Sequence, residues 1–304
     1  MKKPKLNHYC AAFALPLLFM STSHAAYTTV WSDSYDTTVA SVDINTQNAT
    51  RQTGVLAPIS YVANVPNQST DYHQQVLGTP GPLLLAGDAG IGTFSATPSL
   101  NTVGYATVSP NYNFKGLTGG GEVIGKQITV DVDVFGAANT LSSASITIGG
   151  NSTLEGGRQS GQTSGLTVKL IEDTFSGSNL GNFIQLYDSG VFLANFFGSP
   201  AGSGGWMNIR FDVNDPTDQN PWDGVGQTST DIYIGDTLLV NYTKLGGGYT
   251  NNYITLEGTA DFVDFSLTTH LFDNLTVSSS PIPEPSAALL GGLGLLGLLR
   301  RRRA

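Results

Sequence analysis

The sequence contains very little cysteine and histidine. Its single cysteine, Cys10, lies near the start, and the only histidines after residue 25 are His73 and His270. Zinc sites and activated nucleophiles are built mainly from these residue types. The region after residue 25 therefore forms no disulfide. Because it also lacks a G-x-S-x-G elbow, the sequence argues against zinc enzymes and against cysteine or serine hydrolases.

Charged residues are also scarce, at 12% of the chain, and basic residues are fewer than acidic ones. Of 14 basic residues, 7 lie in the two ends, whereas all 23 acidic residues lie between Asp33 and Glu284. The region between residues 26 and 284 thus carries a net charge of 7 − 23 = −16. Such a surface repels phosphate backbones, so nucleic-acid binding is excluded, while calcium or cationic polymers would be attracted.

Long apolar runs are absent, and one of the two short ones follows the basic start Lys2, Lys3 and Lys5. The run "CAAFALPLLFM" is followed by "STSHAA", in which Ser23 and Ala25 are small residues at the −3 and −1 positions of a cleavage site. A basic start, a short apolar stretch and small residues are typical of a secretory signal peptide. We expect residues 1–25 to direct the chain to the Sec export machinery and to be removed.

Short segments of alternating polarity fill the middle of the chain. In "KQITVDVDVFG", Ile128, Val130, Val132 and Val134 alternate with Thr129, Asp131 and Asp133. This period of two indicates half-buried antiparallel strands, and no segment of the middle has a helical period. We therefore predict an all-β sandwich over residues 26–277. Residues 26–81 are less regular, and two alternatives stay open for them: part of the sandwich, or a separate arm.

An acidic loop, "DVNDPTDQNPWDG", supplies the only candidate metal ligands. Asp212, Asp215, Asp218 and Asp223 offer the carboxylate oxygens that calcium prefers. Their spacing differs from that of an EF-hand, and Asp-Pro, Asn-Pro and Asp-Gly are also ordinary turn sequences. A calcium site and a plain loop therefore remain alternatives, and no other cofactor is expected.

Aromatic residues gather in the last third of the chain. Trp206, Trp222, Tyr249 and Tyr253 are candidates for sugar contacts, since aromatic rings offer a flat apolar area with a polar edge. The alternative is packing in the core, because strands are generally rich in aromatic residues.

The end of the chain, "PIPEPSAALLGGLGLLGLLRRRRA", combines three elements. These are Pro283-Glu284-Pro285, an apolar segment over 286–299, and the arginines Arg300, Arg301, Arg302 and Arg303. A helix of this apolar segment is about 21 Å long, short of a hydrocarbon core of about 30 Å. The arginines should stay on the cytoplasmic side. We therefore expect residues 278–304 to stop the chain in the inner membrane only temporarily.

This tail resembles the PEP-CTERM sorting signal of Gram-negative envelope proteins. The resemblance implies cleavage by an exosortase-type membrane protease and delivery to the cell surface or extracellular matrix, often together with exopolysaccharide and biofilm production. The strands "GGWMNIRFDV", "TDIYIGDTLLVNY" and "HLFDNLTVS" resemble concanavalin A-like and laminin-G-like sandwiches. That resemblance implies an antiparallel jelly roll, flanked here by the signal helix and the apolar C-terminal helix.

Three functions are compatible with these features. The first is a non-enzymatic surface protein that binds carbohydrate, with exopolysaccharide as a partner. The second is an extracellular polysaccharide hydrolase or lyase, although none of the glutamates before the tail lies in a Glu-x-Asp-x-x-Glu strand. The third is a structural or adhesive envelope protein without a small ligand.

Overall fold

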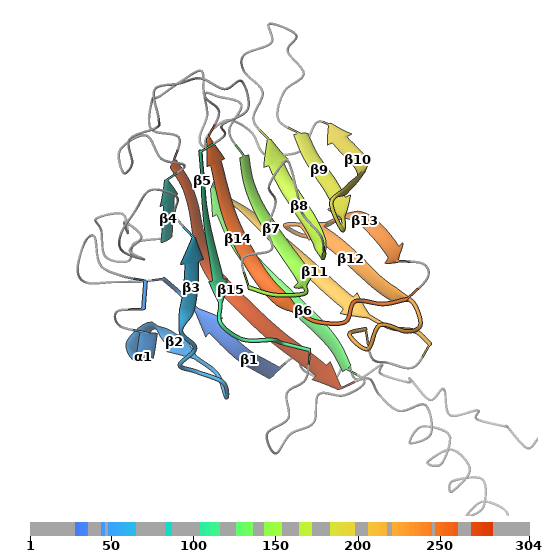
Figure 1. The fold of residues 1–304 in the computed structure, drawn as a ribbon, viewed down its shortest axis with the longest axis horizontal. Coiled ribbons are helices and arrows are strands. Elements are labelled where there is room, and N and C mark those ends of the chain that lie inside the picture. Colours follow the sequence, from blue (N-terminus) through green and yellow to red (C-terminus); the bar gives the residue numbers. More distant parts are fainter. Residues whose placement is uncertain are drawn as a thin grey trace, which may run out of the picture.

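The protein is a sandwich of two antiparallel sheets with almost no helix (Figure 1). The computed structural model describes residues 28–35, 44–45, 48–64, 83–86, 104–115, 126–135, 143–153, 164–171, 183–197, 206–217, 221–244, 247–260 and 269–281. The predicted all-β antiparallel architecture is confirmed over these residues. The expected signal peptide, the sorting tail after residue 281 and the two helices that go with them lie outside the described residues.

The first sheet has eight strands. Its order is β13 (Thr237–Lys244), β12 (Thr228–Ile234), β11 (Trp206–Asn214), β6 (Lys126–Phe135), β15 (Thr269–Pro281), β1 (Thr28–Asp33) and β2 (Gln52–Thr53), and β4 (Leu83–Ala86) pairs with β15 off this path. The one described helix, α1 (Asn48–Arg51), is a single turn that leads directly into β2.

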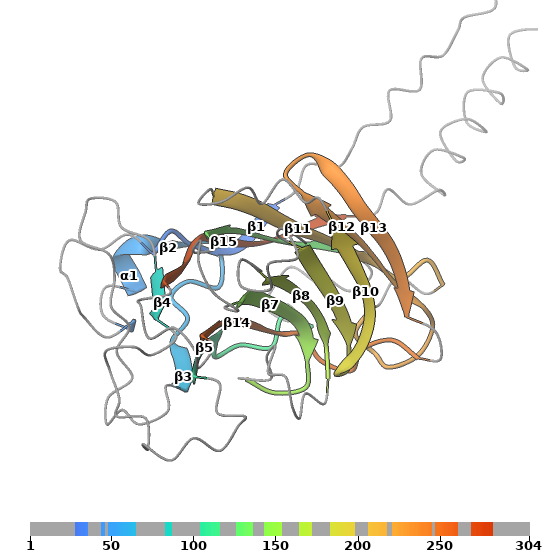
Figure 2. The ribbon, with the colours of Figure 1, turned by 90° about the horizontal axis from the view of Figure 1, so that it is seen from above.

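The second sheet has seven strands and lies beneath the first in Figure 2. Its order is β10 (Val191–Phe197), β9 (Phe183–Asp188), β8 (Leu166–Ile171), β7 (Ser143–Gly150), β14 (Tyr253–Ala260), β5 (Gly104–Pro110) and β3 (Tyr61–Asn64).

The core lies between the sheets and follows the alternation of the strands. In β6, Ile128, Val130, Val132 and Val134 are all buried, and β11 and β12 alternate in the same way. Burying one such side chain contributes roughly 1.5–3 kcal/mol. The predicted inward face of β6 is therefore correct, and its aspartates lie on the opposite side of the sheet.

The described part of residues 28–64 contributes strands to both sheets. β1 pairs with β15 and β3 pairs with β5. Trp31, Tyr35 and Tyr61 are buried in the same core cluster as the residues of β6. In Figure 1 the blue strand β1 lies beside the red strand β15, so the beginning and the end of the described chain meet in one sheet.

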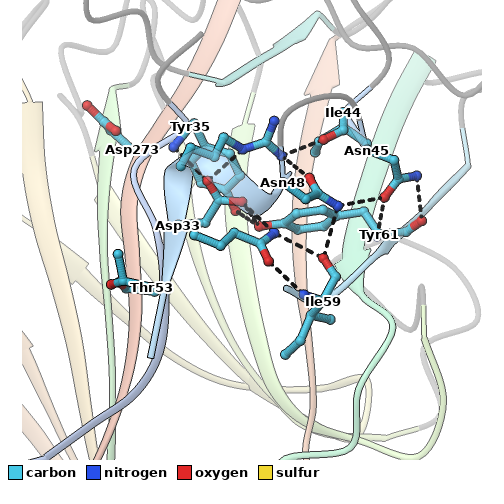
Figure 3. A network of polar contacts seen from close by, with 12 residues as sticks. Asp33, Tyr35, Ile44, Asn45, Asn48, Thr53, Ile59, Tyr61 and Asp273 are labelled. Atoms are coloured by element: carbon cyan, nitrogen blue, oxygen red, sulfur yellow. Dashed lines mark hydrogen bonds and ion pairs between the residues drawn. The ribbon is translucent and has the colours of Figure 1, made fainter. Parts of the chain in front are cut away.

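A buried polar network fastens this N-terminal segment (Figure 3). The carboxylate of Asp33, which is 0% exposed, accepts hydrogen bonds from Arg51 Nε at 2.8 Å, Gln52 Nε2 at 2.9 Å and the Tyr61 hydroxyl at 2.8 Å. It also accepts one from the backbone N–H of Tyr35 at 2.8 Å. A buried charge needs such compensation, and here the donors come from α1, β2, β3 and the backbone just after β1.

A second polar cluster ties the two sheets together at their other edge. Asp188 of β9 accepts hydrogen bonds from the hydroxyls of Tyr242 at 2.5 Å and Tyr249 at 3.2 Å. It also forms an ion pair with Lys244 Nζ at 2.9 Å. Tyr242 and Lys244 belong to β13 of the first sheet, so this cluster holds the β10 edge next to the β13 edge (Figure 2).

Candidate functional site

The face of the eight-stranded sheet that points away from the core carries the candidate site. We call it the outer face and define it by the outward side chains of β15, β6, β11, β12 and β13. Because β11 alternates strictly, Trp206, Asn208, Arg210 and Asp212 share this face while the intervening residues are buried. Cross-strand register then places each of them beside polar groups of the neighbouring strands.

Asn208 joins two aspartates of the neighbouring strand. It lies opposite Asp133 in register, and its amide nitrogen donates to Asp131 Oδ1 at 2.5 Å and to Asp133 Oδ1 at 3.0 Å. Asn274 of β15 donates to the other oxygen of Asp133 at 3.0 Å. Two asparagines thus hold two carboxylates in fixed positions on a partly exposed surface.

Arg210 lies on the next row of the outer face. Its guanidinium stands 4.1 Å from the centre of the Tyr233 ring, and its Nε lies 3.4 Å from Asp212 Oδ2. The other oxygen of Asp212 accepts from the Thr129 hydroxyl at 2.8 Å. The arginine plane and the tyrosine ring therefore form a stacked pair next to an ordered carboxylate.

The surroundings of Asp131 on this face change the acidity of its carboxyl group. The pKa of Asp131 is raised, first because burial disfavours its charged form and then because Asp133 and Asp212 repel it. The hydrogen bond from Asn208 and the positive charge of Arg210 oppose this rise. Asp131 therefore keeps its proton to a higher pH than an ordinary aspartate does.

Trp206 is the aromatic residue that projects most from this face. It is 48% exposed, whereas the other two tryptophans, Trp31 and Trp222, are 0% and 2% exposed. Trp206 begins β11 on the same side as Asn208, two residues or about 6.6 Å along the strand. An exposed indole next to fixed amide and carboxylate groups offers both a stacking surface and hydrogen bonds.

The aspartates of the acidic loop are placed apart. Asp212 is on the outer face, whereas Asp215 is 0% exposed and accepts from the backbone N–H groups of Thr217 at 2.6 Å and Gln227 at 3.0 Å. Asp223 is exposed and accepts from the backbone N–H of Val225 at 2.8 Å.

Asp218 lies outside the described residues. Within the described ranges, no group of three or more histidine, cysteine, aspartate or glutamate side chains could hold a metal ion. Asp215 and Asp223 each accept backbone hydrogen bonds that close a local turn. A turn of this kind is the plain-loop alternative to a calcium site.

The remaining aromatic candidates are less exposed than Trp206. Trp222 and Tyr249 are 2% and 4% exposed and pack together with ring centres 6.0 Å apart. Tyr253 is half-buried at the start of β14. Rings as buried as Trp222 and Tyr249 present almost no surface to solvent, so Trp206 is the most exposed of the four.

Sequence reasoning did not select Asn208, Arg210, Tyr233 or the pair Asp131 and Asp133 as site residues. The alternation in "KQITVDVDVFG" already placed the two aspartates on one face. Nothing local indicated that Asn208, 75 residues from Asp133 in sequence, would lie between them. That neighbour comes only from the register of β11 against β6.

The fold and the outer face together define the protein as an antiparallel β-sandwich with an ordered polar surface. Residues 281–303 match the PEP-CTERM protein-sorting motif, which confirms the resemblance of the tail. This motif indicates a Gram-negative protein that is exported, sorted to the surface and processed at its C-terminus by an exosortase. In the part of the chain that the structure describes, no helix is long and apolar enough to cross a membrane.

No curated protein matches the sequence. Similar solved structures include the Lotus tetragonolobus seed lectin, with 9% identity over 74% of this chain and 95% of that chain and a TM-score of 0.44. The legume lectin-like domain from Entamoeba histolytica has 8% identity over 74% and 91%, with a TM-score of 0.40. The potassium-bound carbohydrate recognition domain of Emp46p has 12% identity over 72% and 88%, with a TM-score of 0.42.

Proposed function

We propose that this protein is a surface or matrix protein that binds polysaccharide on its outer face without cleaving it. The observation that carries this proposal is the exposed indole of Trp206 beside the hydrogen-bonded group of Asn208, Asp131 and Asp133. The sorting motif supports it, since a resemblance to such signals implies delivery to the cell surface, often together with exopolysaccharide production.

The chemistry of the face suits a polyhydroxylated chain. Sugar rings have apolar faces that pack on aromatic rings, and hydroxyls that donate to carboxylates and accept from amides. Asn208 and Asn274 hold Asp133 before any ligand arrives, so little side-chain freedom is lost on binding. The row formed by Arg210 and Tyr233 extends the same surface by one more strand.

The arrangement of Asp131 and Asp133 supports binding without turnover. Glycoside hydrolysis needs one carboxyl to protonate the leaving group and a second, separately placed, to act as nucleophile or base. Here Asp131 and Asp133 accept from the same amide nitrogen of Asn208, on one side of the ligand surface. A hydrolase or lyase, and an adhesive protein without a ligand, are the alternatives that the experiment must separate.

The binding test uses the purified protein, its Trp206→Ala and Trp206→Phe variants, and Val225→Ala as a control at another exposed apolar residue. We expect wild-type protein to be retained by exopolysaccharide of the producing strain and on a glycan array. Loss of the ring should weaken binding about tenfold, while phenylalanine keeps most of it. Val225→Ala should bind as wild type.

Each outcome decides between the alternatives. No retention by any polysaccharide, or equal binding by Trp206→Ala, contradicts a site on the outer face. Shortening of the polymer during incubation, measured by size-exclusion chromatography, supports a hydrolase or lyase instead. Adhesion of cells without glycan binding supports the structural role.

The processing of the tail is tested separately. We propose that the apolar segment anchors the chain briefly in the inner membrane, with Arg300–Arg303 inside, until an exosortase cuts near Pro283-Glu284-Pro285. Mass spectrometry of the surface protein should find a C-terminus that lacks the arginines and an N-terminus that begins after Ala25. An intact arginine end on the surface protein contradicts this proposal.

A further inference from the structure

Strand β10 forms one edge of the seven-stranded sheet and, among the described strands, pairs only with β9. Its first three residues are large, apolar and exposed: Val191 is 63% exposed, Phe192 47% and Leu193 39%. No other three consecutive described residues are large, apolar and exposed. The unpaired backbone groups of an exposed edge strand are a ready template for another strand.

This edge has little protection against pairing. The sequence of β10, "VFLANFF", contains no charged residue, no proline and no glycine. Soluble proteins usually guard such edges with charges, proline or a bulge. The one such feature in β10 is a bulge between Phe192 and Ala194, which leaves Leu193 without a partner on β9. From Ala194 to Phe197 the register with β9 is regular, and no described strand pairs with the other edge of this part.

Charge determines which partner fits this edge. Between residues 26 and 284 the chain carries 7 − 23 = −16, so most contacts between two copies would bring carboxylates together. β10 has no carboxylate. The acid opposite Val191 in register, Asp188, is compensated by Lys244 at 2.9 Å and by the hydroxyl of Tyr242 at 2.5 Å. At β10 itself, therefore, no uncompensated carboxylate of this strand opposes the approach of a second copy.

We propose that two copies of the protein pair through β10, antiparallel across a two-fold axis, so that their seven-stranded sheets become one continuous sheet. Antiparallel edge pairing is self-complementary, because each strand offers the other the same row of donors and acceptors. The contact buries Phe192 and Leu193 of both copies. It does not rest on the proposed polysaccharide site, which lies on the other sheet.

The pairing has a consequence for a matrix protein. Each dimer carries two outer faces, and two linked faces hold one polymer far more tightly than a single face, since the second contact forms at a high effective concentration. It also removes the most exposed apolar segment of the described chain from water.

The test measures the oligomeric state of the wild-type protein and of the Phe192→Lys and Leu193→Lys variants by sedimentation equilibrium over a range of concentrations. The control is Leu238→Lys, because Leu238 is 49% exposed on β13, the edge strand of the other sheet. We expect wild type and Leu238→Lys to be dimers. Each β10 variant should dissociate at least about tenfold more readily, because the lysine charge would be buried without a partner in the apolar contact between the strands.

Cross-linking gives a second measurement that does not depend on destabilised variants. In a Cys10→Ser background, Asn195→Cys on β10 should form a covalent dimer on mild oxidation, whereas Asn241→Cys on β13 should not. Circular dichroism checks that each variant is folded. A wild-type protein that stays monomeric at every concentration overturns the proposal, as does a dimer that survives both lysine variants. Monomers that sediment with phosphatidylcholine vesicles only when Phe192 is present assign the edge to a lipid surface instead.

Discussion

Removing the carboxylate of Asp33 should destabilise the protein more than any surface change. Asp33 and Arg51 form a buried ion pair at 2.8 Å, with side-chain exposures of 0% and 1%. In an Asp33→Ala variant the guanidinium of Arg51 stays buried without its counter-charge. Breaking a buried pair in this way costs about 3–5 kcal/mol.

Two of the three other donors of the network, the side chains of Gln52 and Tyr61, add little to this cost. Gln52 Nε2 also donates to the carbonyl of Ile59 at 3.0 Å, and the Tyr61 hydroxyl lies 3.2 Å from that of Tyr35. Both keep a partner when Asp33 is replaced, so neither adds the full penalty of an unsatisfied buried donor. We therefore expect a total loss of about 4 kcal/mol, which lowers the melting temperature by roughly 8–16 °C for a domain of this size.

Urea unfolding followed by tryptophan fluorescence measures the loss, with Asp223→Ala as the matched control. Asp223 is exposed and accepts one backbone hydrogen bond, so its removal should cost less than about 1 kcal/mol. A double-mutant cycle with Arg51→Met isolates the pair itself. If Asp33→Ala unfolds within about 1 kcal/mol of wild type, the network does not fasten residues 28–64 to the sandwich, and the reasoning fails.

Three further predictions concern local contacts. Gly149 has φ +70°, and an added Cβ would lie 2.9 Å from Cγ of Tyr249, so Gly149→Ala should cost about 2–4 kcal/mol in urea unfolding. Gly235→Ala, at φ +57° with open space around it, should cost only about 1–2 kcal/mol, and equal costs would contradict the clash. Burial, then the charge of Asp188, raises the pKa of Tyr249 above its ordinary value, so the folded protein keeps a proton that the unfolded chain loses. Stability should therefore fall as pH rises above about 10, and less steeply in Tyr249→Phe; parallel curves would refute this. The raised pKa of Asp131 means that its ionisation destabilises the fold as pH rises from about 4 towards neutral. Asp131→Asn should therefore gain stability relative to wild type at neutral pH but not in acid, which urea midpoints at both pH values will check.

Local alternation predicted that the middle of the chain is built of strands. The alternation of Ile128, Val130, Val132 and Val134 was enough to identify β6 and its buried face, because a period of two in β-branched residues is typical of a half-buried strand. The sequence left open whether residues 26–81 belong to the sandwich or form a separate arm, because this segment has no such clear alternation. Their strands are short, and their partners β15 and β5 are distant in sequence, so no local period marks them.

The candidate site was predicted less well than the fold. Trp206 and Trp222 are only sixteen residues apart and chemically identical, yet one is 48% exposed and the other 2%. The difference depends on Tyr249, which packs against Trp222 from another part of the chain. Asp212 and Asp215 also have different environments although they are close in sequence. Asp212 lies on the outer face of a strand, whereas Asp215 closes a turn.

The linear sequence was enough to recognise the sorting motif at the C-terminus and the all-β class of the fold. Sorting signals are linear segments, and strand alternation is a property of consecutive residues. Both can therefore be recognised without knowing which residues are in contact. Which side chains lie together on one surface became known only from the folded arrangement of the strands. Asn208 meets Asp131 and Asp133, and the edge of β10 stays open, because strand order and register are set by packing over the whole chain.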